Sequence, residues 1–415
     1  MTARILVIGA SPLRERFFVS AARLGLHTTV IEESVYARSD RLCDRAFAWR
    51  LVHQGRPGPD RERLDELAGR FDGVVPHTDW GVPIAAELCQ RWGLPGAGPA
   101  AARRGHDKVG VRETANRLHA GGAVGYRVVR EAADLPPFFA DHPGPAILKP
   151  VDGTGSAGVR FVATGREAAG ALPAALDCSA TRSAIIEEFI QGREYSIEAV
   201  VRGGIAVVAA ITEKTTSGPP SFIELRHIVD AGQQGSQAAA GAGCFAAELA
   251  RALEVQDAVL HIEAKHSGGR WFLVEVSCRP AGGLIPDLVW LALGLDLHEE
   301  QLRCALGWPS QAPAAGPAER VAGIEFVAGT GTVADISSVY PIVAGLPSIR
   351  SVESLLAAGT RIDHIGANWW RAGYVLGAST SRADLEDDLA AAASRMSSAL
   401  GLRPLAPVTV RETGT

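Results

Sequence analysis

The stretch that decides the fold is AVLHIEAKHSGGRWFLVEVSCRPAGG, residues 258–283. Apolar and polar side chains alternate in its first half, which predicts a strand with Glu263 on its polar face. The second half alternates in the same way and places Glu275 opposite an apolar face. Gly268 and Gly269 lie between the two halves and indicate a hairpin turn. The sequence therefore predicts two antiparallel strands that each bury one face and carry one glutamate on the other.

The register of this hairpin decides what the two acids can do. A two-residue turn at Gly268 and Gly269 sets Glu263 opposite Val274, with the glutamates on opposite faces. A loop of odd length with a bulge brings Glu263 level with Glu275, and the composition of the faces favours this shifted register. Neighbouring carboxylates need a cation or a proton between them, and oxygen ligands suit Mg²⁺. The alternative is an ordinary exposed hairpin with two solvated acids.

Composition places the chain among globular proteins of two or three domains. Its 415 residues are 47% apolar and 21% charged, with a formal net charge of −5. No run of lysine or arginine offers a nucleic-acid surface, and the apolar stretch near 284–295 is far shorter than a membrane span. The apolar N-terminal segment is too short for a signal peptide, and six scattered cysteines without a CxxC pair indicate reduced, mostly buried thiols. We therefore expect a cytoplasmic protein with no nucleic-acid or membrane partner.

The N-terminus opens with a β-α-β pattern. Residues 4–10 predict a buried strand, residues 11–24 a helix and residues 27–33 a second strand. This alternation is typical of a doubly wound parallel sheet. The residues after Gly9 do not follow the G-x-G-x-x-G pattern, so we do not expect a dinucleotide site there.

A glycine-rich loop follows a lysine farther along the chain. The sequence PAILKPVDGTGSAGVRFVAT (145–164) predicts a strand that ends near Lys149, a loop with three glycines and a returning strand. Backbone N–H groups without bulky side chains suit a phosphate group, and the lysine adds positive charge. A plain hairpin connection is the alternative. A helix at 166–176 and a strand at 183–190 complete a small α+β unit.

The last quarter of the chain reads as a separate lobe. The segment WPSQAPAAGPAE (308–319) is rich in proline and alanine and indicates a boundary. Beyond it we expect a lobe that includes a helix at 382–400. The tail at 404–415 is expected to fray.

In this order, the pieces resemble the ATP-grasp superfamily of carboxylate–amine ligases. The resemblance runs from Arg4 to about Leu400. It implies a multidomain α/β and α+β fold that begins with a Rossmann-like, doubly wound parallel α/β domain at 1–113. A central lid domain follows at 114–195, and a C-terminal antiparallel-sheet domain at 196–415 carries the terminal lobe after about residue 310.

The resemblance implies a nucleotide site. Lys108 and Lys149 are similar to the two phosphate-binding lysines of the superfamily, and the glycine loop is similar to its mobile loop. The stretch EEFIQGREYSIE (187–198) resembles the interdomain hinge that holds adenine, and Glu194 matches the acid that binds ribose. The residues implied to bind ATP are Lys108, Lys149, Gly153, Gly155, Ser156, Gly158, Glu187, Glu188, Phe189, Ile190 and Glu194.

The resemblance also implies a metal site and catalytic residues. Glu263 and Glu275 match the glutamates that bridge Mg²⁺, with Mn²⁺ as an alternative metal. Ser277 stands where many relatives have a metal-binding asparagine, and because a hydroxyl is a poorer ligand the number of metal ions stays open. Arg279 matches the arginine beside the transferred phosphate, and we expect it to be catalytic together with Lys149.

Within the superfamily, the stretch EVSCRPAGG and the terminal lobe look most like L-amino-acid ligases, which make dipeptides, and their biotin-carboxylase-like relatives. The segment 211–231 fits the strand-loop-strand of these ligases. The resemblance therefore implies substrate contacts from Glu224, His227, Arg279, Gly282 and Gly283.

The implied activity is that of an ADP-forming ligase. It turns an amino acid or a small carboxylic acid into an acyl phosphate and couples it to an amine or a second amino acid. This implies ATP and Mg²⁺ as cofactors, small-molecule partners and a role in dipeptide or antibiotic biosynthesis, with a homodimer as one option for the assembly. The alternatives are a carboxylase of the biotin or purine type that uses bicarbonate, and a non-catalytic nucleotide-binding protein. The two amino substrates are not implied, because pocket residues lie on variable loops.

Overall fold

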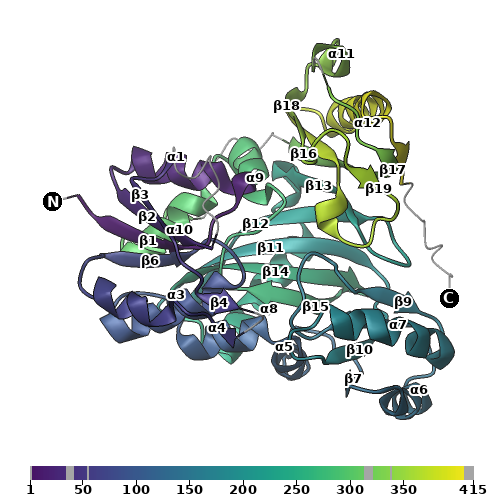
Figure 1. Cartoon of the computed structure of the whole chain (residues 1–415), viewed down its shortest axis with the longest axis horizontal. Helices are drawn as coiled ribbons and strands as arrows, with labels where there is room; N and C mark the ends of the chain where they lie inside the picture. Colours follow the sequence, from purple (N-terminus) through teal and green to yellow (C-terminus); the bar gives the residue numbers. More distant parts are fainter. Residues whose placement is uncertain (1, 34–41, 54–55, 313–320, 337–338, 406–415) are drawn as a thin grey trace. The chain divides into compact units, whose positions relative to one another are not determined.

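The computed structural model describes residues 2–33, 42–53, 56–312, 321–336 and 339–405 (Figure 1). The chain divides into two compact units, each built from three stretches of sequence. The first unit comprises Met1–Ala123, Tyr195–Ile211 and Gln234–Gly316, and the second comprises Val124–Glu194, Thr212–Gln233 and Pro317–Thr415. The three-domain division inferred from the sequence stays a prediction. Most of the expected linker and of the expected frayed tail lies outside the described residues.

A four-stranded parallel sheet begins the first unit. Its strand order is β3 (Arg45–Ala48), β2 (His27–Glu32), β1 (Arg4–Ile8) and β6 (Gly73–Pro76), and every neighbouring pair is parallel. The helices that pack on it are α1 (Glu15–Arg23), α3 (Gly81–Trp92) and α10 (Leu297–Leu306) (Figure 1). Leu6 and Ile8 share a core with α3, whereas Ile5 and Val7 share another with α1 and α10. Helices therefore cover both faces, which confirms the predicted doubly wound layer.

An antiparallel layer completes the first unit. Its strand order is β15 (Arg270–Ser277), β14 (Ala258–Ser267), β11 (Arg193–Arg202) and β12 (Ile205–Thr216). The helices α4 (Pro99–His106), α5 (Lys108–Ala115) and α8 (Gln237–Leu253) share a core with these strands, in which Phe245, Leu260 and Trp271 are buried. The remaining elements are η1 (Pro12–Arg14), β4 (Val52–His53), β5 (Arg56–Pro57), η2 (Arg61–Leu67) and α9 (Ile285–Leu293).

The second unit contains a small α+β layer. Its antiparallel strand order is β7 (Tyr126–Val129), β10 (Ala184–Glu188), β8 (Ala146–Pro150) and β9 (Arg160–Val162). The helices α6 (Leu135–Asp141) and α7 (Gly165–Asp177) pack on it through Phe138 and Leu172. This is the strand, loop, strand, helix and strand arrangement expected from residues 145–190.

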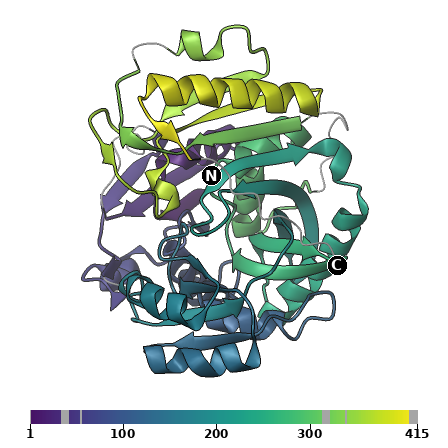
Figure 2. The same ribbon diagram turned by 90° about the vertical axis from the view of Figure 1, so that its right-hand side faces the viewer.

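The terminal lobe of the second unit is built on further strands of the antiparallel sheet that contains β12. Its strand order runs from β12 through β13 (Glu224–Asp230), β16 (Val321–Val327) and β20 (Gly373–Ser379) to β18 (Ile349–Ser354). Figure 2 shows α12 (Arg382–Ala399, yellow) lying along these strands, where Leu385, Leu389 and Met396 are buried. The smaller elements are η3 (Ala132–Asp134), η4 (Ala231–Gln233), β17 (Gly329–Thr332), α11 (Tyr340–Val343), β19 (Arg361–Ile362), η5 (Asn368–Trp370) and β21 (Arg403–Pro404).

Candidate active site

The hairpin of β14 and β15 has the register that the sequence favours. Glu263 pairs directly with Glu275, and the next pair is Ala264 with Leu273. Val274 is therefore an extra residue on its strand, which is the geometry of a β-bulge. The two carboxylates that the sequence singled out lie level on neighbouring strands.

The turn of this hairpin differs from the expectation. It has two residues, Gly268 and Gly269, both with positive φ (55° and 77°), as tight hairpin turns require. The expected loop of odd length is wrong. The bulge at Val274 alone supplies the one-residue shift that aligns the glutamates.

Each of the two glutamates has a cationic neighbour. Glu275 Oε1 lies 3.4 Å from Lys108 Nζ, and Glu263 Oε1 lies 3.2 Å from His261 Nε2. Lys108 is the first residue of α5, which Asp107 caps by accepting a backbone N–H two residues on. One of the expected phosphate-binding lysines thus lies beside the expected metal-binding acids.

His261 is held by a buried acid that sequence reasoning missed. Its Nδ1 lies 2.7 Å from Glu198 Oε1 and 3.0 Å from Ser196 Oγ, and Glu198 is fully buried. Burial lowers the pKa of His261, but the charges and hydrogen bonds of Glu198 and Glu263 outweigh burial and raise it to about 9. The imidazolium therefore separates two carboxylates. The available signal was an acid within an otherwise apolar strand segment, IEAVV.

The paired carboxylates fit a magnesium ion. Glu263 and Glu275 offer the oxygen ligands that Mg²⁺ prefers, and the cations beside them show that negative charge gathers there. Ser277 donates its hydroxyl to Asp79 Oδ1 at 3.2 Å, so its hydrogen is engaged with another acid while its oxygen keeps its lone pairs. Among the described residues, no cluster of three or more His, Cys, Asp or Glu side chains is arranged to hold a metal ion. Phosphate oxygens and water would complete the coordination.

Arg279 is paired with an acid that the sequence analysis also missed. Its Nε and Nη2 donate to Oδ1 and Oδ2 of Asp79, each at 2.7 Å, and its Nη1 donates to Pro280 O at 2.7 Å. Burial raises the pKa of Asp79, but the charges of Arg279 and Arg14 outweigh burial and lower it to about 2. The signal for Asp79 was its place just after a buried parallel strand, where ligands meet such sheets.

The two glycines expected at the substrate lie close to this pair in the chain. A Cβ built on Gly282 would lie 3.7 Å from Nη2 of the buried Arg14, so the backbone passes close to that guanidinium. Gly283 has φ 59°, a conformation that favours glycine. Arg14 itself was not among the sequence candidates.

In the second unit, two residues expected at the nucleotide pair with each other. Lys149 on β8 and Glu187 on β10 are both buried, with Nζ 2.7 Å from Oε2. The neighbouring Glu188 accepts the backbone N–H of Gly125 at 2.6 Å and donates its own N–H to Gly125 O at 2.9 Å. Phe189 follows β10 and packs edge-on against Phe161, with ring centroids 5.1 Å apart. The backbone N–H of Phe189 donates to Pro145 O at 2.9 Å, so two N–H groups near Ile190, those of Glu188 and Phe189, already have partners.

The glycine loop at 152–158 lies against the turn before β20. Gly155 and Ser156 have positive φ (62° and 60°), which orients successive N–H groups of the loop. Gly155 O accepts the N–H of Asn368 at 2.9 Å. A Cβ on Gly155 would lie only 3.0 Å from the ring of Trp369, so this close approach requires a glycine.

The remaining candidates of the second unit gather around a lysine that sequence reasoning missed. Lys214 Nζ lies 3.2 Å from Glu194 Oε1 and 2.9 Å from Glu224 Oε1. Glu224 Oε2 in turn lies 3.3 Å from Arg371 Nη1 and 3.6 Å from His227 Nε2. The expected ribose-binding acid and the expected substrate residues therefore form one charged cluster.

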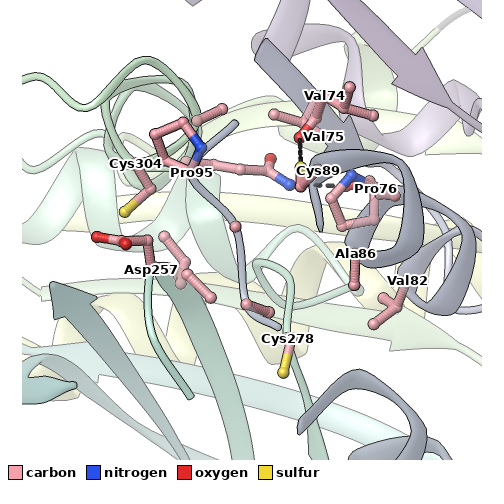
Figure 3. A pocket seen from close by; sticks show the side chains of 17 residues that line it. Val74, Val75, Pro76, Val82, Ala86, Cys89, Pro95, Asp257, Cys278 and Cys304 are labelled. Atoms are coloured by element: carbon pink, nitrogen blue, oxygen red, sulfur yellow. Dashed lines mark hydrogen bonds between the residues drawn. The ribbon is translucent and has the colours of Figure 1, made fainter. Parts of the chain in front are cut away.

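The cysteines take no part in these clusters. Figure 3 shows Cys89, Cys278 and Cys304 around a cavity of about 30 Å³ in the first unit, with room for a water molecule and not for a substrate. Burial raises the pKa of these thiols to about 12, 12 and 11, so they stay neutral. Cys178 and Cys244 are exposed, so the expectation of mostly buried thiols holds for only three of the six. None of the described helices combines the length and apolar character of a membrane span.

Comparison with known proteins bears on the class. Residues 142–287 match the ATP-grasp domain family. The chain is 27% identical over 403 residues to the uncharacterized protein y4rH of Sinorhizobium fredii, which covers 93% of this chain and 80% of that protein. It is 25% identical over 331 residues to human carnosine synthase 1, which covers 73% of this chain but only 40% of that synthase.

The fold has solved counterparts. An L-amino acid ligase from Bacillus licheniformis superposes with a TM-score of 0.79 at 21% identity, covering 95% of this chain and 97% of that ligase. The biotin carboxylase domain of Hydrogenobacter thermophilus 2-oxoglutarate carboxylase, solved with ADP, magnesium and bicarbonate, superposes with a TM-score of 0.72 at 16% identity over 97% and 90% of the two chains.

These matches confirm the predicted fold. The chain has the ATP-grasp fold, with an ATP-grasp domain at residues 142–287. The structural match to an L-amino acid ligase, at 21% identity, shows that the chain shares the fold of such a ligase, in line with the resemblance inferred from the sequence.

Proposed function

We propose that the chain is an ADP-forming carboxylate–amine ligase that joins an amino acid to an amine or to a second amino acid. One observation carries the proposal, namely the register that places Glu263 beside Glu275 and within reach of Lys108. Two carboxylates and a lysine at one place suit a triphosphate with its divalent cation. The ATP-grasp match and the likeness to an L-amino acid ligase support the same activity.

The nucleotide is held by the residues that the resemblance implied. We assign the phosphate charges to Lys108 and Lys149, the phosphate oxygens to the backbone of loop 152–158, and the ribose to Glu194. Adenine lies against Phe189 and the backbone near Ile190. Each lysine must exchange its present carboxylate partner for phosphate oxygens.

Glu263 and Glu275 would hold Mg²⁺, with Mn²⁺ as an alternative, and the bound metal neutralises phosphate charge. Glu224 and His227 hold one amino substrate. The cytoplasmic location, a homodimeric assembly and a role in natural-product biosynthesis stay predictions.

The reaction has two steps. A carboxylate oxygen of the acyl donor attacks the γ-phosphorus, the bond to the bridging oxygen breaks, and ADP leaves an acyl phosphate behind. The amine nitrogen then attacks the acyl carbon, phosphate departs with the carbon–oxygen electron pair, and the nitrogen loses a proton. Arg279 stabilises the charge on the transferring group and on the tetrahedral oxyanion. Closure of loop 152–158 keeps water from the acyl phosphate.

A substrate screen tests this proposal. The full chain is incubated with ATP, Mg²⁺ and L-amino acids, singly and in pairs, while ADP, AMP and phosphate are measured and products are weighed by mass spectrometry. We expect ADP and phosphate in equal amounts, only when an amino acid and an amine are both present, together with an amide product. Stoichiometric AMP would contradict the acyl-phosphate route.

A matched pair of variants links the activity to the hairpin. Glu275→Gln removes one carboxylate of the pair and should abolish turnover. Glu254→Gln removes an exposed acid of the same unit, 3.0 Å from Arg104, and should leave turnover unchanged.

The likeness to a biotin carboxylase domain favours one alternative. A carboxylase requires bicarbonate as the acyl donor and does not respond to a second amino acid. Bicarbonate-dependent ADP release would replace the ligase proposal with this one. Nucleotide binding without turnover under every condition would instead favour a non-catalytic nucleotide-binding protein.

A further inference from the structure

We propose that Arg14, Asp79 and Arg279 form a receptor for the zwitterion of a free amino acid. Its carboxylate binds the two arginines, and its ammonium group binds the aspartate. The inference rests on the proposed ligase function and names its acyl donor, which is an amino acid with a free ammonium group rather than any small carboxylic acid.

The place of this cluster in the fold is one at which α/β sheets bind ligands. Strands β1 and β6 are parallel neighbours, and their carboxyl ends meet where Ile8 pairs with Pro76. The chain leaves β1 toward β2 on one side, while β6 lies on the other side, so the strand order reverses between them. Arg14 follows β1 and Asp79 follows β6. Ligands bind at such switch points outside the carboxyl ends of the strands.

The three side chains of the cluster carry more positive than negative charge. The buried Glu198, whose charge also reaches Arg14, already has His261, Ser196 and the Ala281 N–H as partners. Asp79 is the acid that Arg279 contacts, through both of its oxygens. Among the described residues, the one hydrogen bond of the Arg14 guanidinium goes from Nη1 to the backbone oxygen of His77. Asp79 and Glu198 act on the buried Arg14 through their charge and not through a hydrogen bond. A substrate carboxylate would give this guanidinium a direct hydrogen-bonded partner.

The neighbouring histidines do not change the net charge of the cluster. His77 and His298 are buried, and neither ring has a hydrogen-bond partner among the described residues. Burial, reinforced by the charge of Arg14, lowers the pKa of His77 well below its usual value. Burial likewise lowers the pKa of His298, to about 3. Both rings are therefore neutral and add no charge to the receptor.

The exposed part of the cluster is its acid. The Asp79 side chain is 29% exposed, whereas that of Arg279 is 9% exposed. Three of the five N–H donors of Arg279 are used by Asp79 and by Pro280 O, which leaves two for a further oxygen. A ligand that reaches this pair therefore meets a carboxylate and guanidinium donors side by side, the arrangement that complements adjacent ammonium and carboxylate groups.

Binding measurements without turnover test the receptor separately from the ligase activity. The full chain is titrated calorimetrically, with and without ADP and Mg²⁺, against the twenty L-amino acids. Each one that binds is compared with its analogue lacking the amino group, for example propionate for L-alanine or 3-phenylpropionate for L-phenylalanine. We expect at least one amino acid to bind, and its analogue to bind roughly 10- to 100-fold more weakly, since a charge-assisted contact is lost.

Two variants separate the roles of the charges. Asp79→Asn should weaken binding of the amino acid by roughly 10- to 100-fold and leave binding of the analogue unchanged. Arg14→Gln leaves the ion pair of Asp79 with Arg279 intact. It should weaken binding of the amino acid and binding of the analogue by the same factor. Asp65→Asn removes an acid that pairs with Arg91 at the surface of the same unit, and should change neither affinity.

The outcomes decide the proposal. It is overturned if no amino acid binds, if wild type binds both members of a pair equally, or if Asp79→Asn weakens both members equally, since the aspartate then only holds Arg279 in place. Should Asp79→Asn fail to fold by circular dichroism, Arg14→Gln and the wild-type comparison still decide. Selective binding without ADP release would keep the receptor and refute the ligase.

Discussion

Replacing Lys214 by methionine should destabilise the second unit, because this lysine is the buried cation between two acids. Its side chain is 1% exposed, and Nζ lies 3.2 Å from Glu194 and 2.9 Å from Glu224. Methionine keeps most of the length of the side chain and removes the charge. The two carboxylates, 15% and 17% exposed, then lose the cation that separates them.

The expected cost follows from the geometry. Removing one partner of a buried ion pair costs about 3–5 kcal/mol. Arg371 remains 3.3 Å from Glu224 and offsets part of this loss, so we expect a cost of about 2–4 kcal/mol. For a unit of roughly 190 residues, that cost lowers the unfolding midpoint by about 4–16 °C.

Calorimetric unfolding measures this shift, and hydrogen exchange assigns it to β12 and its neighbours. The matched control is Arg193→Met, since Arg193 is 81% exposed and lies 3.7 Å from Glu213 in the same unit. An exposed pair contributes at most about 1 kcal/mol. A second change, Lys214→Met with Glu224→Gln, should recover part of the loss. A Lys214→Met midpoint equal to that of the control, or no recovery in the double variant, would refute the reasoning.

Three further results follow from the same geometry. Arg279→Ala should lower kcat for phosphate release by about 100-fold or more while ATP affinity changes little; steady-state kinetics with each substrate varied would show otherwise if kcat stayed near normal. Hydrogen exchange in loop 152–158 should slow when a non-hydrolysable ATP analogue and Mg²⁺ bind, and unchanged exchange would argue against a closing loop. Burial raises the pKa of Asp287 from 3.8 to about 6, so the stability that its protonated form provides is complete below pH 3.8 and is lost as the pH rises to about 6. Asp287→Asn should therefore have a free energy of unfolding about 1–3 kcal/mol higher than wild type at pH 7.5, and lose this advantage at pH 4, as thermal unfolding at the two pH values would show; a gain that did not depend on pH would contradict the assignment.

The hairpin shows which features of the fold could be predicted from the sequence. Alternation with a period of two assigns the residues of both strands to a face, and burial of the apolar face favours the register that aligns Glu263 with Glu275. The alternation does not determine whether a bulge or a longer turn produces that register. A bulge at Val274 and a longer turn shift the pairing equally, and the composition of the two faces does not distinguish them.

The candidate site was predictable one residue at a time, but its pairings were not. Lys149, Glu263 and Arg279 stand out because residue type and local pattern mark them. Asp79 and Glu198 each have a local signal, but their roles depend on partners that lie 200 and 63 residues away in the chain. Contacts over such separations are made by the tertiary fold, and a single sequence contains no local signal for them.

The pairings change how ligand binding is to be understood. A buried lysine or arginine with no partner would cost several kcal/mol, and at Lys108, Lys149 and Arg279 the fold offsets this cost with an acid beside each. Lys149 contacts Glu187, Lys108 contacts Glu275, and the guanidinium of Arg279 contacts Asp79. ATP must therefore replace the carboxylate partners of the two lysines with its own oxygens, which needs a ligand of higher charge or better geometry than a single carboxylate. A triphosphate with its metal ion meets that requirement, and a lone small anion does not, so the two lysine–carboxylate pairs favour a nucleotide.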